Sequence, residues 1–401
     1  MSKEKKQVIP DLRFPEFRNS EGWNMQEIGE FINETQNIAS KTLPKYSLTI
    51  EDGVIPKSKR YERSFLVKDD LDAYKVVSTD DFVYNPMNLR FGAIAKYRGK
   101  EEVAVSKYYN VFNCDNSVVS SFCEFYFKSY PMITYYNDVA TGSLIEKRRV
   151  HFSEFLKFKI PFPKFEEQQK IANCLSSLDE VISAETEKLD LLQDHKKGLL
   201  QQLFPQEGET QPKYRFPEFK EDWAIKEVSQ IFDVTRGYVL SMSLVSEAKT
   251  EENKFPVYSS QTKNNGLAGF YNEFLYEDAI TWTTDGANAG DVNFREGKFY
   301  CTNVCGVLLN KNGFANKCVA EIINSVAKKH VSYVGNPKLM NGVMSKIKIA
   351  IPSLKEQQKI ASCLATVDEL IESQKQKIED LQAHKKGLLQ QLFPKVNVNR
   401  V

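Results

Sequence analysis

The sequence predicts an α+β protein in which two mixed, strand-containing domains are joined by two long antiparallel helices. Three observations carry this prediction: an eleven-residue segment that occurs twice unchanged, a heptad pattern on the stretch leading into each copy, and two dissimilar blocks rich in strand-like runs. Together they indicate an internal pseudo-two-fold repeat with a ring-like topology. The predicted segments are a first domain (1–158), a central repeated helical region (159–211), a second domain (212–347) and a distal repeated helical region (348–401).

Length and composition agree with a two-domain protein. The 401 residues exceed what one hydrophobic core usually covers. The positive charges of Lys and Arg (54) nearly balance the negative charges of Asp and Glu (53). The composition therefore lacks the overall basic excess that is typical of many nucleic-acid-binding proteins. The first residues lack the apolar stretch of a signal peptide and no long apolar run follows, so we expect a cytoplasmic protein without membrane contact. Seven cysteines without a CxxC pair predict reduced, metal-free thiols, with Cys301 and Cys305 buried in a strand-like stretch.

The repeat extends well beyond its identical part. HKKGLLQQLFP occurs at His195–Pro205 and again at His384–Pro394, and the alignment continues backwards without a gap from KIPFPKFEEQQKIA to KIAIPSLKEQQKIA. A shorter motif, RFPEF, starts at Arg13 and again at Arg215. Its acidic neighbours could suggest nuclease carboxylates, but the second copy lacks the preceding Pro-Asp, which favours a capping strand or turn. The order is therefore cap, variable block and helix, twice.

Each repeated segment carries the pattern of a long helix with one buried seam. Apolar residues recur in alternating steps of four and three. Prolines precede both helices and end them, at Pro205 and Pro394. Some 36 residues at about 1.5 Å each make a rod of about 54 Å, and two such rods most simply bury their seams against each other. The predicted seam residues are Ile171, Leu175, Leu178, Ile182, Leu189, Leu192, Leu199 and Leu203, and Ile360, Leu364, Val367, Ile371, Ile378, Leu381, Leu388 and Leu392.

Two features interrupt these helices in both copies. Polar residues occupy seam positions, namely Glu185 and Lys196 in the first helix and Gln374 and Lys385 in the second. They either set the register between helices or are tolerated near solvent. Gly198 and Gly387 stand in the same turn of each copy, where glycine costs about 1 kcal/mol relative to alanine. Close approach by another backbone would explain them, and a frayed last turn is the alternative.

The variable blocks, about 18–158 and 220–347, are predicted to be compact mixed domains. Strand-like runs in the first are DDFVYNP, FGAIAKY, VFNC and SFCEFYF, and in the second AITWTTDG, GVLL and SKIKIAIP. Helices are expected late in each block, within SFCEFYFKSYPMITYY and CVAEIINSVAKKHVSY.

Loops of both blocks combine side chains that suit base edges and phosphates of duplex DNA. Any one of them could equally be part of an ordinary solvated turn, and the basic run around Arg148 could be an ion-paired surface. The candidate DNA-binding residues are Asn85, Asn88, Arg90, Lys107, Tyr108, Lys147, Arg148 and Arg149 in the first block, and Ser260, Gln261, Lys263, Asn264, Asn265, Thr284, Asn288 and Arg295 in the second.

No motif for catalysis is found. Neither a G-x-x-x-x-G-K-[ST] phosphate loop nor a G-x-G-x-x-G fingerprint occurs. YNPMN, starting at Tyr84, shares only part of the motif with which adenine methyltransferases hold their target, and no glycine-rich cofactor loop accompanies it. A stand-alone methyltransferase or nuclease is therefore disfavoured.

The layout resembles the specificity (S) subunit of type I restriction-modification systems. The resemblance rests on two dissimilar blocks, each followed by a near-identical long helix, and on RFPEF, PFPKFEEQQKIA or IPSLKEQQKIA, and HKKGLLQQLFP. It covers essentially the whole chain and is most specific in the helices. WTTDGANAG, and YNPMNLRFG followed by SKYYNVF, resemble stretches of that family's target-recognition domains.

The resemblance implies that each block reads one half of a bipartite, asymmetric site in double-stranded DNA and that the helices fix the distance between the halves. It implies two modification subunits that use S-adenosylmethionine to methylate adenine, and restriction subunits that use ATP and Mg. The chain itself would then bind no cofactor or metal and carry no catalytic residue. Identical segments would bind identical partners, which gives a pseudo-two-fold assembly. A two-domain coiled-coil scaffold that does not bind DNA is the alternative.

Overall fold

The structure, a computed structural model, describes residues 8–39, 43–57, 73–144, 148–205, 209–260 and 264–396. The chain divides by packing into two compact units, one formed by Met1–Thr186 with Gln376–Val401 and the other by Glu187–Lys375. Each unit therefore contains one globular domain, part of the first long helix and part of the second. The four segments predicted from the sequence are consecutive stretches of the chain. Each packing unit instead combines stretches that are far apart in the sequence or cuts through a long helix.

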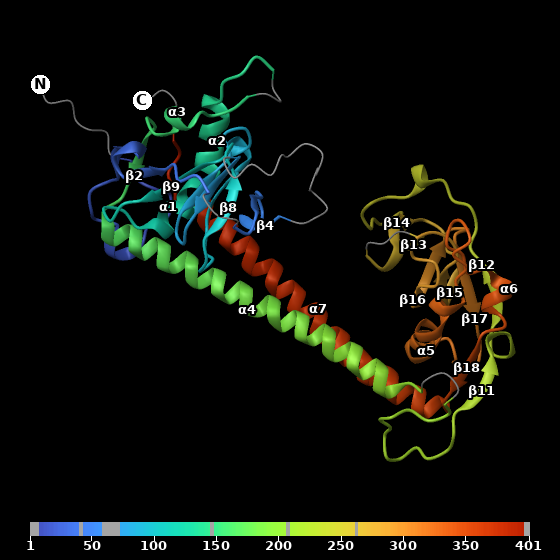
Figure 1. Ribbon diagram of the computed structural model, residues 1–401. Helices are drawn as coiled ribbons and strands as arrows, with labels where there is room; N and C mark the ends of the chain where they lie inside the picture. Colours follow the sequence, from blue (N-terminus) through green and yellow to red (C-terminus); the bar gives the residue numbers. More distant parts are fainter. Residues whose placement is uncertain are drawn as a thin grey trace, which may run out of the picture. The chain divides into compact units, whose positions relative to one another are not determined.

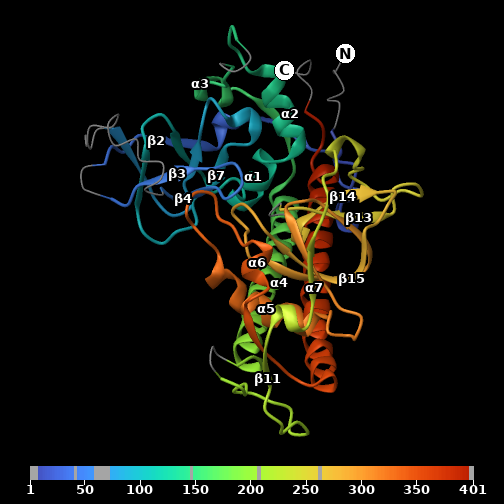
Figure 2. The same ribbon diagram turned by 90° about the vertical axis from the view of Figure 1, so that its right-hand side faces the viewer.

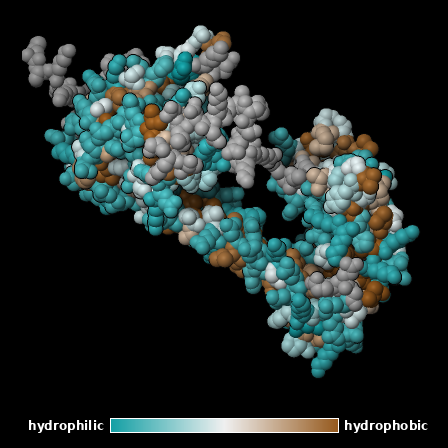
Figure 3. All heavy atoms as spheres, viewed as in Figure 1, coloured by the Kyte–Doolittle hydropathy of each residue, from teal (hydrophilic) through white to brown (hydrophobic). Residues whose placement is uncertain are grey.

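Two long helices dominate the structure, α4 (Phe165–Leu203, 39 residues) and α7 (Leu354–Gln391, 38 residues). They lie side by side in both views (Figures 1 and 2). Their direction is antiparallel, because Glu185 pairs with Lys377 while the earlier Asp179 pairs with the later Lys385. All of the predicted seam residues are buried or half-buried, whereas hydrophilic residues predominate on the visible surface (Figure 3). The prediction of two long antiparallel helices is confirmed.

The first domain is built on antiparallel sheets. Its four-stranded sheet has the order β2 (Ile32–Thr35), β9 (Asn110–Cys114), β6 (Phe82–Tyr84) and β7 (Ile94–Lys96). The two-stranded sheets pair β1 (Asn24–Glu27) with β10 (Lys159–Phe162), β3 (Tyr46–Leu48) with β4 (Val54–Pro56), and β5 (Tyr74–Val77) with β8 (Val103–Ser106).

Aromatic side chains fill the core of this domain. Helices α1 (Ser120–Phe127), α2 (Tyr130–Val139) and α3 (Phe152–Phe155) contribute half of the buried ones. Phe393, just after α7, stacks on Tyr126 with ring centroids 5.0 Å apart, so the end of the second long helix belongs to the first domain's core. The run SFCEFYF, predicted to be strand-like and also part of a possible helix, forms α1. A short continuous apolar run carries no periodicity that separates a buried strand from a buried helix.

The second domain contains a six-stranded sheet. Its order is β12 (Asp233–Arg236), β17 (Cys305–Leu309), β15 (Tyr276–Thr283), β16 (Val292–Cys301), β13 (Phe255–Tyr258) and β14 (Leu267–Tyr271). Neighbours are antiparallel except β13 and β16, which are parallel. Cys301 and Cys305 are buried in β16 and β17 as expected.

Outside this sheet, β11 (Ala224–Glu227) pairs with β18 (Lys348–Ile351) just before α7. Helix α5 (Lys317–Ala327) packs on β16 and β18, and the short α6 (Asn341–Met344) precedes β18. The side chain of Asn316 caps α5 by accepting a hydrogen bond from the Val319 amide at 3.1 Å. Leu203 and Phe204, at the end of α4, are buried in this domain's core, as Leu392 and Phe393 are in the first.

Candidate nucleic-acid interface

The RFPEF motif is anchored to the start of a long helix in each unit, and we call this contact the joint. In the first joint, Arg13 donates from Nε and Nη2 to the two carboxylate oxygens of Glu167, at 2.8 and 2.7 Å. In the second, Arg215 makes the same two bonds to Glu356, at 2.8 and 2.9 Å. The hydrogen bond to Glu167 raises the pKa of Arg13 above its ordinary value. Both pairs are bidentate and largely buried, so the motif is a structural anchor.

The glutamine that follows each joint glutamate ties the helix to the adjacent domain. Gln168 donates to the Pro163 carbonyl at 3.0 Å and accepts from the Val119 amide at 2.8 Å. Gln357 donates to the Pro352 carbonyl at 2.8 Å and accepts from the Asn316 side chain, also at 2.8 Å. The repeated EQQ motif therefore makes the same bond to its helix start and reaches a different element in each domain.

Three of the four polar seam positions form ion pairs across the two helices, and the fourth, Gln374, is buried. Lys196 lies 2.9 Å from Asp368, and Lys385 pairs with Asp179 at the equivalent place in the repeat. Glu185 also pairs with Lys377, at 2.6 Å. Each pair places opposite charges at a defined position along the two helices. This favours a role of these residues in setting the register between the helices over simple tolerance near solvent.

The second domain has a polar pocket of about 140 Å³ that brings three candidate residues together: Asn265, Asn288 and Arg295. Arg295 is only 9% exposed. Its Nε donates to the Thr281 hydroxyl at 3.0 Å, its Nη2 donates to the Asn265 carbonyl at 2.7 Å, and its guanidinium lies 3.7 Å from the centroid of the Tyr258 ring. Burial lowers the pKa of Arg295 from its ordinary value.

A left-handed turn borders this pocket between β13 and β14. Asn264, Asn265 and Gly266 have φ angles of 51°, 51° and 85°, a conformation that asparagine and glycine adopt more readily than other residues. The turn is closed by the Ser259 amide, which donates to the Gly266 carbonyl at 2.8 Å. Both asparagine side chains are exposed. Arg295 therefore supports the turn from inside, while the asparagines are available to a ligand outside.

The remaining candidates of the second domain differ in access. Asn288 is half-buried and its side chain donates to the Ser260 carbonyl at 3.4 Å. Thr284 is buried and donates to the Val304 carbonyl at 2.9 Å. Gln261 and Lys263 of this domain, and Lys147 of the first domain, are candidates that lie outside the described residues. Asn293 of β16 and Asn324 of α5 also line the pocket but were not among the predicted residues, because an isolated polar residue on a strand or helix forms no recognisable motif.

The first domain gathers its candidates at one end of the four-stranded sheet. Tyr84 of β6 pairs with Asn110 of β9, which places the turn holding Lys107 and Tyr108 beside the one that begins at Asn85. Lys107 is exposed, and Tyr108 is 80% exposed. The polar side chains that follow β6 and precede β9 can therefore act together.

Of the other candidates of the first domain, three make local contacts and two are exposed. Asn85 is half-buried and accepts from the Met87 amide at 3.1 Å, whereas Asn88 is exposed. Arg148 donates to the carbonyls of Asn137 and Ala140, at 2.8 and 3.0 Å, and so caps the end of α2. The half-buried Arg90 stacks on Phe91, and Arg149 is exposed.

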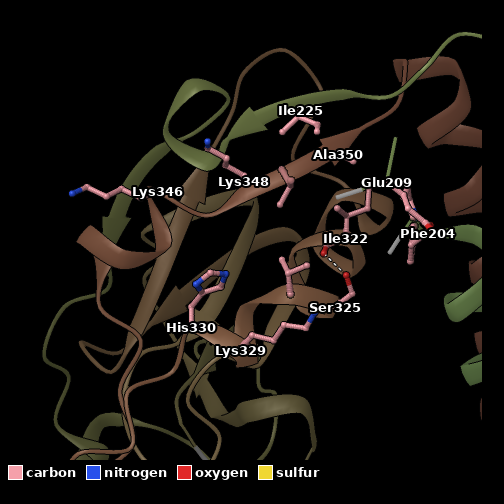
Figure 4. A pocket seen from close by; sticks show the side chains of 13 residues that line it. Phe204, Glu209, Ile225, Ile322, Ser325, Lys329, His330, Lys346, Lys348 and Ala350 are labelled. Atoms are coloured by element: carbon pink, nitrogen blue, oxygen red, sulfur yellow. Dashed lines mark hydrogen bonds between the residues drawn. The ribbon is translucent and has the colours of Figure 1, made fainter. Parts of the chain in front are cut away.

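A groove of about 400 Å³ lies elsewhere in the second unit, between β18, α5 and the end of α4. Figure 4 shows Ile225, Ile322 and Ala350 around it, while Lys346 extends away from them. Lys329, His330 and Lys348 give it a basic rim. An apolar floor does not suit the polar edges of bases, so this groove is distinct from the candidate interface.

Comparison with known proteins identifies the family. Residues 20–194 and 220–383 match the type I restriction modification DNA specificity domain. The chain belongs to this family. The MjaX type I restriction enzyme specificity subunit of Methanocaldococcus jannaschii is 24% identical over 407 residues, which cover 93% of each chain. The N-terminus of a type I specificity subunit of Mycoplasma pneumoniae is 42% identical over 142 residues, 35% of this chain and 74% of that sequence.

Solved structures agree on the fold. The S subunit of the type I restriction-modification system of M. genitalium has a TM-score of 0.61 at 15% identity, covering 97% of this chain and 100% of that one. The predicted family and fold class are thus confirmed, and the specificity subunit has two target-recognition domains, one in each matched segment. Among the described residues, no helix is both long and apolar enough to span a membrane.

Proposed function

We propose that each target-recognition domain reads one half of a bipartite, asymmetric DNA site and that α4 and α7 fix the spacing between the halves. One observation carries the proposal: equivalent joints hold two domains whose sheets differ in strand number and order. A scaffold that is repeated within one chain would hold both domains in the same geometry. Because the attached domains are dissimilar, each would recognise a different half of the DNA site. The exposed polar turns of each domain supply the side chains for base readout.

The same proposal assigns the chemistry to partner subunits. Two modification subunits, with S-adenosylmethionine, dock on the repeated helices and methylate adenine. Restriction subunits, with ATP and Mg, complete the cutting complex. This chain recognises DNA without catalysing a reaction, and it works in the cytoplasm, where bacterial and archaeal chromosomes lie. The net charge of this chain is near zero, whereas binding to DNA phosphates relies on Lys and Arg. This supports the proposal that partner subunits supply part of the affinity for DNA.

A gel-shift assay with genomic fragments tests this function, using the chain alone and with its modification subunit. We expect sequence-specific retention once the modification subunit is added. Methylome sequencing of a host with and without the chain should then show one bipartite adenine-methylated motif that depends on it. A chain that binds the modification subunit but leaves both DNA retention and the methylome unchanged would instead support the scaffold function that does not involve DNA.

A further inference from the structure

The glycines of the repeated helices have no explanation within the chain. Both helices continue beyond them, α4 to Leu203 and α7 to Gln391, so neither glycine lies in a frayed end. Apart from its chain neighbours and the backbone of its own helical turn, a Cβ atom added to Gly198 or Gly387 would meet no heavy atom of the described chain within 4 Å. Close packing inside the chain therefore does not exclude a side chain here, although glycine disfavours a helix more than any residue except proline.

The surface around each glycine is open and the same in both copies. One turn before and one turn after the glycine, His195, Gln201 and Gln202 are exposed, as are His384, Gln390 and Gln391. Residues three and four apart lie on one helix face, so each glycine sits between a histidine and two glutamines. We call these two surfaces the glycine faces.

Some other exposed positions of the same helices have diverged, whereas others, such as Lys188 and its equivalent Lys377, are identical. Ala184 and Leu191 of α4 correspond to Ser373 and Asp380 of α7, and all four are exposed. The exposed residues of the glycine faces are instead identical. Packing against the opposite helix constrains the seam, but it does not constrain exposed side chains. Contacts within the chain therefore do not account for the uninterrupted identity of the glycine faces.

We infer that each glycine face is where a backbone segment of one modification subunit packs directly against the helix. This inference rests on the proposed function, which supplies a partner in two copies. The missing side chain lets a partner backbone come closer than any other residue would allow. The flanking histidine and glutamines can hydrogen-bond the polar groups of that backbone. The two faces are equivalent in the repeat, so two copies of one partner bind at equivalent places.

Glycine-to-alanine variants test the inference because they should act oppositely on the free chain and on the complex. Gly198→Ala and Gly387→Ala should each raise the melting temperature of the free chain, because alanine favours the helix and meets nothing. Each should weaken binding of one modification subunit by about tenfold or more. At a modification-subunit concentration between the wild-type and variant dissociation constants, native mass spectrometry should then show mainly one bound copy where wild type shows two, and mainly none for the double variant.

Gly342→Ala is the matched control. It lies in α6, outside the glycine faces, and its Cβ would also meet no described atom within 4 Å; it should leave binding unchanged. Alanine variants that bind two modification subunits as tightly as wild type would overturn the inference and leave the proposed function intact. A lower melting temperature of the free variants would also overturn it, since the chain itself would then require glycine. A wild-type chain that binds no modification subunit would reject both.

Discussion

The two units share their scaffold and differ in what the scaffold carries. Both have a bidentate Arg–Glu joint, a two-stranded sheet leading into a long helix, and the buried Leu-Phe end of the other helix. Beyond these parts, one domain has a four-stranded antiparallel sheet and an aromatic core. The other has a six-stranded sheet with one parallel pair. The parts that hold the domains are constrained together, whereas the parts that read DNA are free to differ.

Even the shared parts are adapted to their domains. Trp223 donates from Nε1 to the joint glutamate, Glu356, at 3.1 Å. The equivalent Trp23 is equally buried, but its Nε1 has no hydrogen-bond partner among the described residues and its ring packs on Phe122 and Tyr126. Trp23 thus supports the first joint by aromatic packing, whereas Trp223 supports the second joint by an additional hydrogen bond.

Removing one joint should have the largest effect on this comparison. Arg13→Ala leaves the carboxylate of Glu167 buried without its cation, which should lower the free energy of unfolding by about 3–5 kcal/mol. Arg215→Ala should cost less, because the Arg215 side chain is 13% exposed against 6% for Arg13, and Trp223 still donates to Glu356. Urea denaturation of both variants measures the difference.

The exposed ion pair of Lys170 with Glu16 provides the control for the joints. Lys170→Ala should change the free energy of unfolding by no more than about 1 kcal/mol. If Arg13→Ala were as mild as Lys170→Ala, the joint would not be what anchors the first cap to its helix.

The sequence predicted the scaffold far better than the recognition domains. Heptad spacing is a local pattern, so the helices, their ends and their seam could be located from it. The joint could not, because Arg13 and Glu167 meet only after folding and carry no mark of partnership beyond recurring together. The parallel pairing of β13 with β16 is likewise non-local. Thr284 and Arg295 were expected among DNA contacts from their polar loops, but loop composition does not report burial.

Lengthening the scaffold should alter spacing without altering recognition. Seven heptad-compatible residues inserted after Leu192 add about 10 Å to α4, which should move the half-sites apart or prevent assembly. A second insertion after Ile371, which lies between the Lys196–Asp368 and Glu185–Lys377 pairs, should restore the register and recover assembly. Methylome sequencing reads out the spacing, and a new half-word at the old spacing would show that the helices read DNA. Inserting four residues should instead disturb the supercoil.

Substitutions in the readers should affect one half-word at a time. Alanine at Asn264, Asn265 or Asn288 should cost about 1–3 kcal/mol per lost bidentate base contact and relax only the word read by the second domain. Asn88→Ala is the counterpart in the first domain and should relax only the other word. Binding to oligonucleotides altered in either half-site measures both effects. Unchanged specificity in all four variants would remove these turns from the interface.

The smallest effect is expected from moving the ends of the chain. The Leu12 amide donates to the Gln391 carbonyl at 3.0 Å, and the Tyr214 amide donates to the Gln202 carbonyl at 2.9 Å. Each cap therefore binds the end of a long helix in the same way, although the chain links only the second cap to the helix end it binds. A circular permutant that begins at Gln206, with Val401 joined to Met1 by a short flexible linker, keeps both contacts. It should fold, bind the modification subunits and specify the same DNA site, since polar linkers tolerate such cuts. Methylome sequencing gives the decisive comparison: a permutant that assembles but directs methylation to a different bipartite site would mean that chain order, and not the repeated joints, positions the two domains.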